Sequence, residues 1–242
     1  MDNETILFLL IVFGSTLTRS IFGFGEALIA MPILSLLLDV KIAAPVVALI
    51  GLVNGTAILS TDLRSVQWSD TRRLILSALV GVPIGIYALK HVPEDAVKLV
   101  LAVVVIGFSL YNLASPRLWR LENNRPAFLF GFFAGMLGGA YNTTGPPLII
   151  FGTLRDWQAQ TFRATIQSVL VPTSLFVVAG HGVAGFWNER VFQLAVFALP
   201  VILITAPLGG WINRKIHGHA YRRLVFVLLL AIGLMLLIHS LR

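Results

Sequence analysis

Long stretches without a single Asp, Glu, Lys or Arg are the feature that most restricts how this chain can fold. They run from Ile42 to Thr61, Leu99 to Pro116, Pro126 to Leu154, Ala164 to Asn188, Val191 to Asn213 and Leu224 to Leu241. A helix needs about 20 mostly apolar residues to cross a bilayer, and each stretch is close to or above that length. Only 12% of the residues are charged, whereas soluble domains have about 25%. An all-α, multi-pass membrane protein is therefore expected.

Motifs of common enzymes and cofactor sites are missing from the sequence. There is no cysteine, no histidine at metal-ligand spacing from a convincing second ligand, and no Walker loop, HExxH, GxSxG or GxGxxG. We therefore expect no catalytic residue, no metal and no cofactor. The net charge of +7 is attributed to basic loops that orient membrane proteins. Nucleic acid is accordingly not expected as a partner, whereas the lipid bilayer is.

One pattern occurs twice in the chain. Phe22 to Leu34 (FGFGEALIAMPIL) and Asn142 to Leu154 (NTTGPPLIIFGTL) each place a glycine-containing break inside an apolar run. A shift of about 120 residues aligns Gly25 with Gly145, and broken segments at matching positions of two halves indicate a transporter binding site. We divide the chain into a first repeat (1–114), a cytoplasmic linker (115–125) and a second repeat (126–242).

The distribution of Lys and Arg favours one of two topologies. If each broken segment crosses the membrane once, eight basic residues lie on one face and nine on the other. If each is a re-entrant hairpin followed by three crossings, twelve face one side and five the other, with Arg19 inside the segment. The second division fits the positive-inside rule. An odd number of passes per half then inverts the second repeat relative to the first, although the crossing model stays open.

Each break is expected to create the start of a helix at membrane depth. Irregular backbone there must be buried in protein or line a wet cavity. Helices restarting near Gly25 and Gly145 would direct unpaired N–H groups and positive dipole ends toward the break, which suits an anion. Thr143 or Thr144 is the expected cap of the second of these helices.

Arg19 and Glu26 are charges within the first broken segment. Intramembrane charges are costly and mark functional sites. Two interpretations stay open: a structural ion pair, or a functional pair in which Arg19 attracts an anion. In the second, Glu26 is the proton-coupling candidate, because a carboxylate beside an anion repels it unless protonated.

The predicted substrate site combines the two breaks with polar residues of the neighbouring helices. Its members are Arg19, Phe22, Gly23, Phe24, Gly25, Asn54, Asn142, Thr143, Thr144, Gly145, Thr165, Gln167 and Ser168. Any one of the polar residues on the crossing helices could instead serve only in hydrogen bonding between helices.

Two motifs resemble a known family. GFGEALIAMPIL at Gly23 to Leu34 and GMLGGAYNTTGPPLIIF at Gly135 to Phe151, followed by FRAT at Phe162 to Thr165, are similar to the sulfite exporter TauE/SafE-like transporters. The likeness covers nearly the whole chain, with Glu26 at a position where many relatives have a small residue. It implies a bacterial inner-membrane carrier or exporter of small organic or inorganic anions, such as sulfite, sulfoacetate, other sulfonates or related carboxylates.

The mechanism expected from these features is alternating access. The two hairpins would hold the anion at their tips and move as a unit relative to the other helices, with a homodimer as the expected assembly. Two other functions stay open: a passive anion channel that uses the same helix ends, and an intramembrane lipid-phosphate enzyme in which Glu26 is the only acid available.

Overall fold

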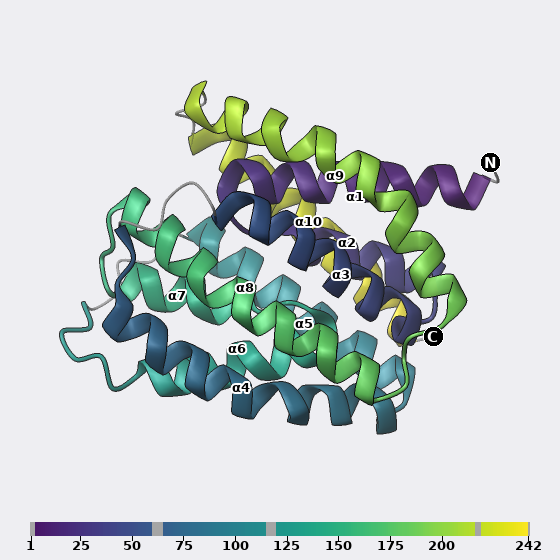
Figure 1. Ribbon diagram of the computed structural model, residues 1–242, viewed down its shortest axis with the longest axis horizontal. Helices are drawn as coiled ribbons and strands as arrows, with labels where there is room; N and C mark the ends of the chain where they lie inside the picture. Colours follow the sequence, from purple (N-terminus) through teal and green to yellow (C-terminus); the bar gives the residue numbers. More distant parts are fainter. Residues whose placement is uncertain (1–2, 60–64, 115–119, 216–218, 242) are drawn as a thin grey trace.

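The computed structural model describes residues 3–59, 65–114, 120–215 and 219–241, and its regular elements in this part are helices (Figure 1). The helices of the first half are α1 (Asn3–Phe22), α2 (Glu26–Leu37), α3 (Val40–Leu59), α4 (Trp68–His91) and α5 (Glu94–Ala114). Those of the second half are α6 (Ala127–Tyr141), α7 (Gly145–Leu154), α8 (Ala159–Val183), α9 (Glu189–Lys215) and α10 (His219–Ser240). The predicted linker lies outside the described residues at 115–119, and 120–125 contain no helix.

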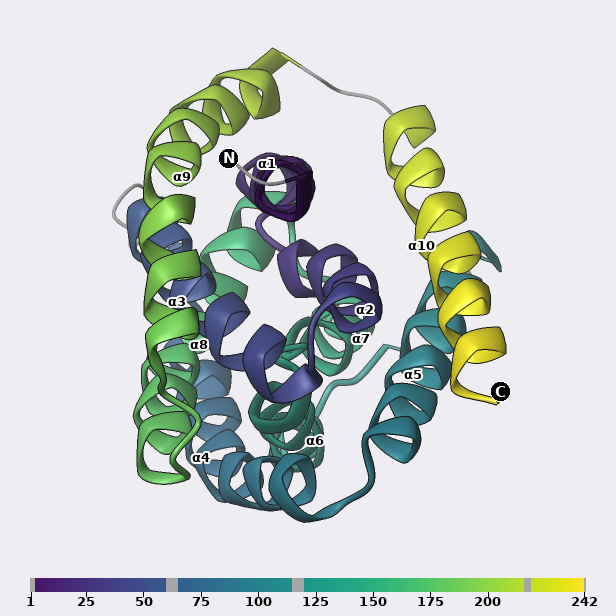
Figure 2. The same ribbon diagram turned by 90° about the vertical axis from the view of Figure 1, so that its right-hand side faces the viewer.

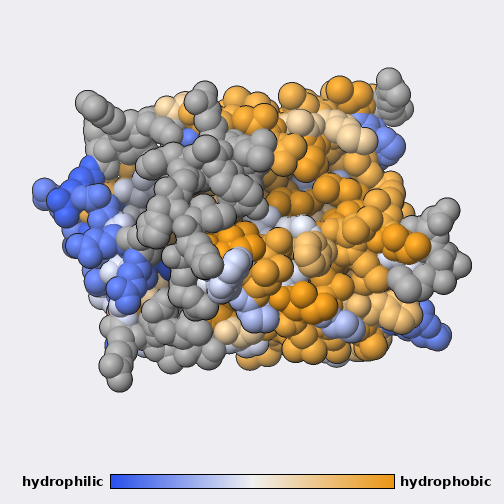
Figure 3. Space-filling view, turned by 90° about the horizontal axis from the view of Figure 1, so that it is seen from above, coloured by the Kyte–Doolittle hydropathy of each residue, from blue (hydrophilic) through white to orange (hydrophobic). Residues whose placement is uncertain are grey.

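Six helices in the described part are long and apolar enough to span a membrane: α1, α3, α4, α5, α8 and α9. The shorter apolar helices α2, α6 and α7 flank the two breaks. In Figure 3, the part of the visible face that is not grey is mostly hydrophobic between hydrophilic residues at both ends of the long axis. This distribution suits a hydrocarbon core between two aqueous faces. The prediction of an all-α, multi-pass membrane protein is confirmed.

Each broken segment turns back on itself. The start of α1 and the end of α2 line one small cavity through Glu4, Thr5, Leu37 and Leu38, so the first hairpin (3–37) begins and ends at the same end of the molecule. At the second hairpin (127–154), the Leu121 N–H donates to the carbonyl of Leu154 at 2.8 Å. The residues just before α6 therefore contact the end of α7.

The two hairpins enter the molecule from opposite ends. Arg190 at the start of α9 pairs with Glu4 of α1, at the end where both termini lie in Figure 1. Arg155 after α7 pairs with Asp70, which lies in the first turn of α4. Because α4 is a 24-residue helix that runs toward the end with the termini, the open ends of the hairpins lie at opposite ends of the molecule.

Packing partners are exchanged between the two halves. α1 of the first half packs on α9 of the second half, and α6 of the second half packs on α4 of the first half. The pairs α3 with α8 and α5 with α10 join corresponding helices of the two halves. Figure 2 shows both hairpins between the α5–α10 pair and a larger group made of α3, α4, α8 and α9.

The α4–α6 contact is a close approach of two backbones. A Cβ atom added to Gly131, Gly135 or Gly139 of α6 would overlap the backbone of α4, and one on Gly81 or Gly85 of α4 would overlap that of α6. Small residues allow membrane helices to approach closely where hydrophobic burial offers little driving force.

The α1–α9 contact is more polar. Thr205 Oγ1 donates to Thr16 Oγ1 at 2.9 Å, and Asn213 Nδ2 donates to the Ile21 carbonyl at 2.5 Å. Gly209 approaches Ser20 so closely that an added Cβ would overlap it. The first hairpin is therefore joined to its neighbour partly through side-chain hydrogen bonds.

Candidate functional site

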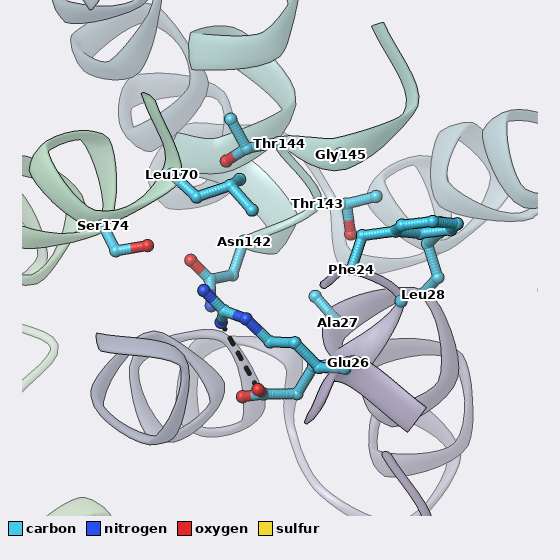
Figure 4. A pocket seen from close by; sticks show the side chains of 12 residues that line it. Phe24, Glu26, Ala27, Leu28, Asn142, Thr143, Thr144, Gly145, Leu170 and Ser174 are labelled. Atoms are coloured by element: carbon cyan, nitrogen blue, oxygen red, sulfur yellow. Dashed lines mark hydrogen bonds and ion pairs between the residues drawn. The ribbon is translucent and has the colours of Figure 1, made fainter. Parts of the chain in front are cut away.

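The two breaks meet inside the molecule and enclose a small pocket of about 30 Å³, which we call the tip pocket (Figure 4). Gly25, at φ 101°, precedes α2, and Asn142, at φ 54°, ends α6. Both are in the left-handed region, which suits glycine and is tolerated by asparagine. The tip pocket is lined by Arg19, Phe24, Gly25, Glu26, Ala27, Leu28, Asn142, Thr143, Thr144, Gly145, Leu170 and Ser174.

The helix starts at the tip pocket differ in the N–H donors they offer. The first turn of α2 contains Glu26, Ala27 and Leu28, whose N–H groups have no acceptor within the helix. In α7, Pro146 and Pro147 follow Gly145, and proline has no N–H. The first hairpin therefore supplies more backbone donors to an anion than the second.

The prediction that Thr143 or Thr144 caps α7 is wrong. Thr144 occupies the N-cap position, but its side chain makes no capping hydrogen bond. Its backbone is right-handed helical, at φ −68° and ψ −22°, whereas a capping residue usually has extended backbone. Thr143 Oγ1 instead donates to the Tyr141 carbonyl at 3.0 Å.

Arg19 and Glu26 form a buried ion pair in the wall of the tip pocket. Arg19 Nη1 lies 3.3 Å from Glu26 Oε2 and donates to the Gly51 carbonyl at 2.8 Å. Asn54 Nδ2 donates to the same carboxylate oxygen at 2.9 Å. The side chains of Arg19 and Glu26 are 7% and 3% exposed. The ion-pair interpretation is therefore correct as geometry, and it does not by itself decide between a structural and a functional role.

Several polar atoms of this pair have no hydrogen-bond partner among the described residues. They are Arg19 Nε and Nη2 and Glu26 Oε1, all buried. Buried polar groups are nearly always hydrogen-bonded, so exceptions call for an explanation such as a bound ligand. Arg19 thus retains donors that can bind an anion while Glu26 holds another part of its guanidinium.

Two glycines of α3 make room for the guanidinium. A Cβ on Gly55 would lie 2.5 Å from Arg19 Nη2, and one on Gly51 would lie 3.1 Å from Arg19 Nη1 and 3.2 Å from Asn142 Nδ2. Neither glycine was among the residues predicted for the site. Because the two glycines are four residues apart, they lie on one face of α3, and this face is turned toward Arg19. Two glycines at this spacing, on either side of Asn54, were the signal in the sequence that could have identified them.

The structure brings together most of the predicted site residues. Arg19, Phe24, Gly25, Glu26, Asn142, Thr143, Thr144 and Gly145 all line the tip pocket. Asn54 lies behind it and binds Glu26. Gln167 Nε2 donates to the Gly23 carbonyl, so these two residues hold the first break against α8. Phe22 lines a separate, larger cavity.

Thr165 and Ser168 are not brought to the tip pocket. Thr165 Oγ1 accepts a hydrogen bond from the Gln67 N–H at 3.1 Å, just before α4, and Ser168 Oγ donates to the Ala164 carbonyl at 2.6 Å. The Thr165 hydroxyl thus joins α8 to the segment before α4, and the Ser168 hydroxyl bonds within α8. Hydroxyls in apolar helices commonly make such bonds. Ser174 lines the pocket but was not among the predicted site residues, although the shift of about 120 residues aligns it with Asn54 in the sequence.

Comparison with known proteins shows the family of the chain. The family model described as sulfite exporter TauE/SafE matches residues 7–236. The chain belongs to this family. The family resemblance inferred from the two glycine-containing motifs is thereby confirmed, and the chain is a membrane transporter protein of the sulfite exporter family.

Two curated relatives have named functions. The chain is 26% identical over 231 residues to the "Probable sulfite/organosulfonate exporter TauE" of Cupriavidus necator, which covers 93% of this chain and 90% of the relative. It is 25% identical over 182 residues to the "Probable inner membrane transporter protein TsaS" of Comamonas testosteroni, which covers 74% of this chain and 75% of the relative. No solved structure matches the chain.

Proposed function

We propose that this protein is a secondary transporter of small sulfur-bearing anions, such as sulfite or sulfonates, in the bacterial inner membrane. The observation that carries the proposal is the tip pocket, where the starts of α2 and α7 meet Arg19, whose Nε and Nη2 have no partner in the described part of the chain. Convergent N–H groups, a helix dipole and a guanidinium together favour an oxyanion. The printed names of the two relatives support the same substrate class and membrane.

The size of the tip pocket suits a compact anionic group. Its volume of about 30 Å³ is far below the roughly 300–1,000 Å³ that is usual for sites that bind drug-sized molecules. The state described by the structure thus admits a small oxyanion only after a slight separation of the hairpin tips. Such a separation is the first movement expected when the substrate binds.

Glu26 gives the site a way to couple anion binding to a proton. The carboxylate holds Arg19 at 3.3 Å and would repel an anion arriving at the same guanidinium. Protonation of Glu26 removes the repulsion and releases Arg19 for the anion. We therefore propose that a proton and the anion bind together.

The two halves are proposed to be inverted repeats. The exchanged packing of α1 on α9 and α6 on α4 supports this arrangement, as do the opposite entry ends of the hairpins. In such transporters one group of helices rocks against another around a fixed central site. The hairpins would accordingly move as one unit between the α5–α10 pair and the larger helix group.

Flux measurements on purified protein in proteoliposomes test the proposed function. A carrier loaded with unlabelled sulfite should show saturable counterflow of labelled sulfite, and an imposed inward proton gradient should accelerate uptake. Glu26→Gln should keep counterflow and lose the acceleration, because residue 26 can no longer change its charge. Ohmic anion conductance without counterflow would instead identify a channel, and an equal response to the gradient in Glu26→Gln would exclude Glu26 as the coupling group.

A further inference from the structure

A second and much larger cavity lies beside the tip pocket. It measures about 460 Å³, and we call it the vestibule. Phe24 lines both spaces, which therefore adjoin at this residue. The vestibule is formed where α1 and α9 end and α8 begins, at the face from which the second hairpin enters.

The walls of the vestibule combine aromatic rings with one half-buried cation. Phe22, Phe24, Trp157 and Phe162 contribute the rings, and Arg163 and Asn213 contribute polar groups. Phe22 and Phe24 lie with their ring centroids 6.3 Å apart, and Trp157 and Phe162 lie 6.4 Å apart in an edge-to-face arrangement. Two aromatic pairs therefore face a space large enough for an organic molecule.

Arg163 is held in place by its neighbours. Its Nη1 donates to Asn213 Oδ1 at 2.6 Å, and Asn213 Nδ2 donates in turn to the Ile21 carbonyl at 2.5 Å. The acid at this cavity is Asp156, whose side chain is 73% exposed and lies 3.9 Å from Arg120. The carboxylate is thus solvated and faces a cation of its own, whereas the charge of Arg163 is fixed at the aromatic wall.

These observations describe a site for an anion with an apolar body. Ligand sites of about 300–1,000 Å³ usually have apolar and aromatic walls with a few placed polar groups. The tip pocket has the charge for an anion but lacks room for an organic body. The vestibule has both, since aromatic rings offer apolar surface and the guanidinium binds oxyanions.

We propose that the vestibule is a second anion-binding site, in which Arg163 binds the charged group of an organic anion and the aromatic rings contact its apolar body. This site adjoins the tip pocket at Phe24. The proposal rests on the proposed transport function, because the vestibule then holds substrate on its way to or from the hairpin tips.

Calorimetric titration of the full-length protein in detergent tests the proposal with two probes: benzenesulfonate, which has an apolar ring, and sulfite, which has none and is kept under anaerobic conditions. Arg163→Gln should weaken benzenesulfonate binding at least tenfold and change sulfite binding less than twofold. Arg190→Gln, which removes an exposed arginine at the opposite end, is the matched control and should change neither. Unchanged benzenesulfonate affinity in folded Arg163→Gln would overturn the proposal.

Two further measurements keep the test independent of a single variant. Phe22→Leu should weaken benzenesulfonate at least threefold and leave sulfite unchanged; an equal loss for both probes would contradict an aromatic contact to the organic body. Saturating sulfite should leave benzenesulfonate bound with an affinity within about threefold of that in its absence. Full competition would mean one shared site and would also overturn the proposal.

The failure of this proposal differs from a failure of the proposed function. In the double variant Arg19→Gln/Glu26→Gln, which removes both buried charges together, sulfite binding should be lost and benzenesulfonate binding should remain. If wild-type protein does not bind sulfite but binds benzenesulfonate through Arg163, the tip-pocket function fails and the vestibule stands. If sulfite binds through Arg19 and benzenesulfonate does not require Arg163, the vestibule fails alone.

Discussion

Arg19 keeps its position at the tip pocket because α3 has glycines rather than larger side chains at positions 51 and 55. Gly51 accepts a hydrogen bond from Arg19 through its carbonyl, and Gly55 leaves the space that the other terminal nitrogen fills. A buried ion pair alone is weak support for stability, since desolvation offsets much of the attraction. The clearance around the guanidinium is therefore better explained by anion binding than by stability.

Gly55→Ala tests this clearance. The added methyl group would collide with Arg19 Nη2 and displace a donor that has no partner among the described residues. Loss of one hydrogen bond to a charged group costs about 1.5–3 kcal/mol, so sulfite affinity should fall by roughly tenfold or more in a calorimetric titration. Gly107→Ala, a helical glycine of α5 with no atom within 4 Å of an added Cβ, is the control and should bind as wild type. Equal affinity in both variants would show that Arg19 does not bind the anion through this donor.

Residue patterns identified part of the site and missed another part for physical reasons. Charges in an apolar run identified Arg19 and Glu26, because such charges are rare unless they serve a purpose. Thr165 and Ser168 were predicted for the site but do not line the tip pocket, since a hydroxyl in an apolar helix can bond equally well to its own backbone or to a neighbouring helix. Gly51 and Gly55 were not found, because a helical glycine is typical of close packing as well.

At the scale of elements, the two hairpins differ in how they are attached. α6 packs on α4 through glycine backbones, and Arg155 after α7 binds Asp70 and the carbonyls of Leu121 and Glu122. α1 packs on α9 through threonine, serine and asparagine side chains. The second hairpin is therefore expected to tolerate substitution at its helix interface less well than the first.

Gly135→Ala tests the α4–α6 interface. The new methyl group would overlap the Ala78 backbone, and overpacking of this kind costs about 1–3 kcal/mol. The midpoint of thermal unfolding in detergent should fall clearly. Gly210→Ala in α9, where an added Cβ meets no atom within 4 Å, should leave the midpoint within error of wild type. A Gly135→Ala midpoint equal to that of wild type would show that the backbones can separate without cost.

The positions of the breaks followed from the sequence, but their capping did not. Helices were expected to restart near Gly25 and Gly145, and α2 and α7 begin at Glu26 and Gly145. Glycine and proline limit backbone geometry directly, so they mark such boundaries well. The cap depended on the backbone angles of Thr144, which residue type does not determine.

At the scale of the whole molecule, charge-free runs were sufficient to predict an all-α membrane protein, because a bilayer admits few other structures. The orientation of the halves rests on the loop charges, with the exchanged packing of α1 and α6 as support. The homodimer stays a prediction. The fold thus followed from general constraints, while the arrangement at the tip pocket depends on contacts between distant segments.

Side-specific labelling of single cysteines tests the topology, and the chain has no native cysteine to interfere. Glu122→Cys and Gln158→Cys flank the second hairpin and should react with a membrane-impermeant maleimide from the cytoplasmic face. Asp95→Cys and Glu189→Cys should react only from the other face. Labelling of positions 122 and 158 from opposite faces would mean that the second broken segment crosses the membrane and would exclude the hairpin model.

The central claim is that an anion binds between the two hairpin tips, and sulfite titration of the double variant Asn142→Gly/Thr143→Val tests it most directly. Glycine keeps the left-handed backbone of residue 142, and valine keeps the shape of Thr143, so the fold should be retained. Thr173→Val removes a buried hydroxyl that bonds within α8 and is the control. We expect the double variant to lose sulfite affinity by at least about tenfold, the equivalent of one charge-assisted hydrogen bond or more, and the control to keep wild-type affinity. Wild-type affinity in the folded double variant would contradict the claim.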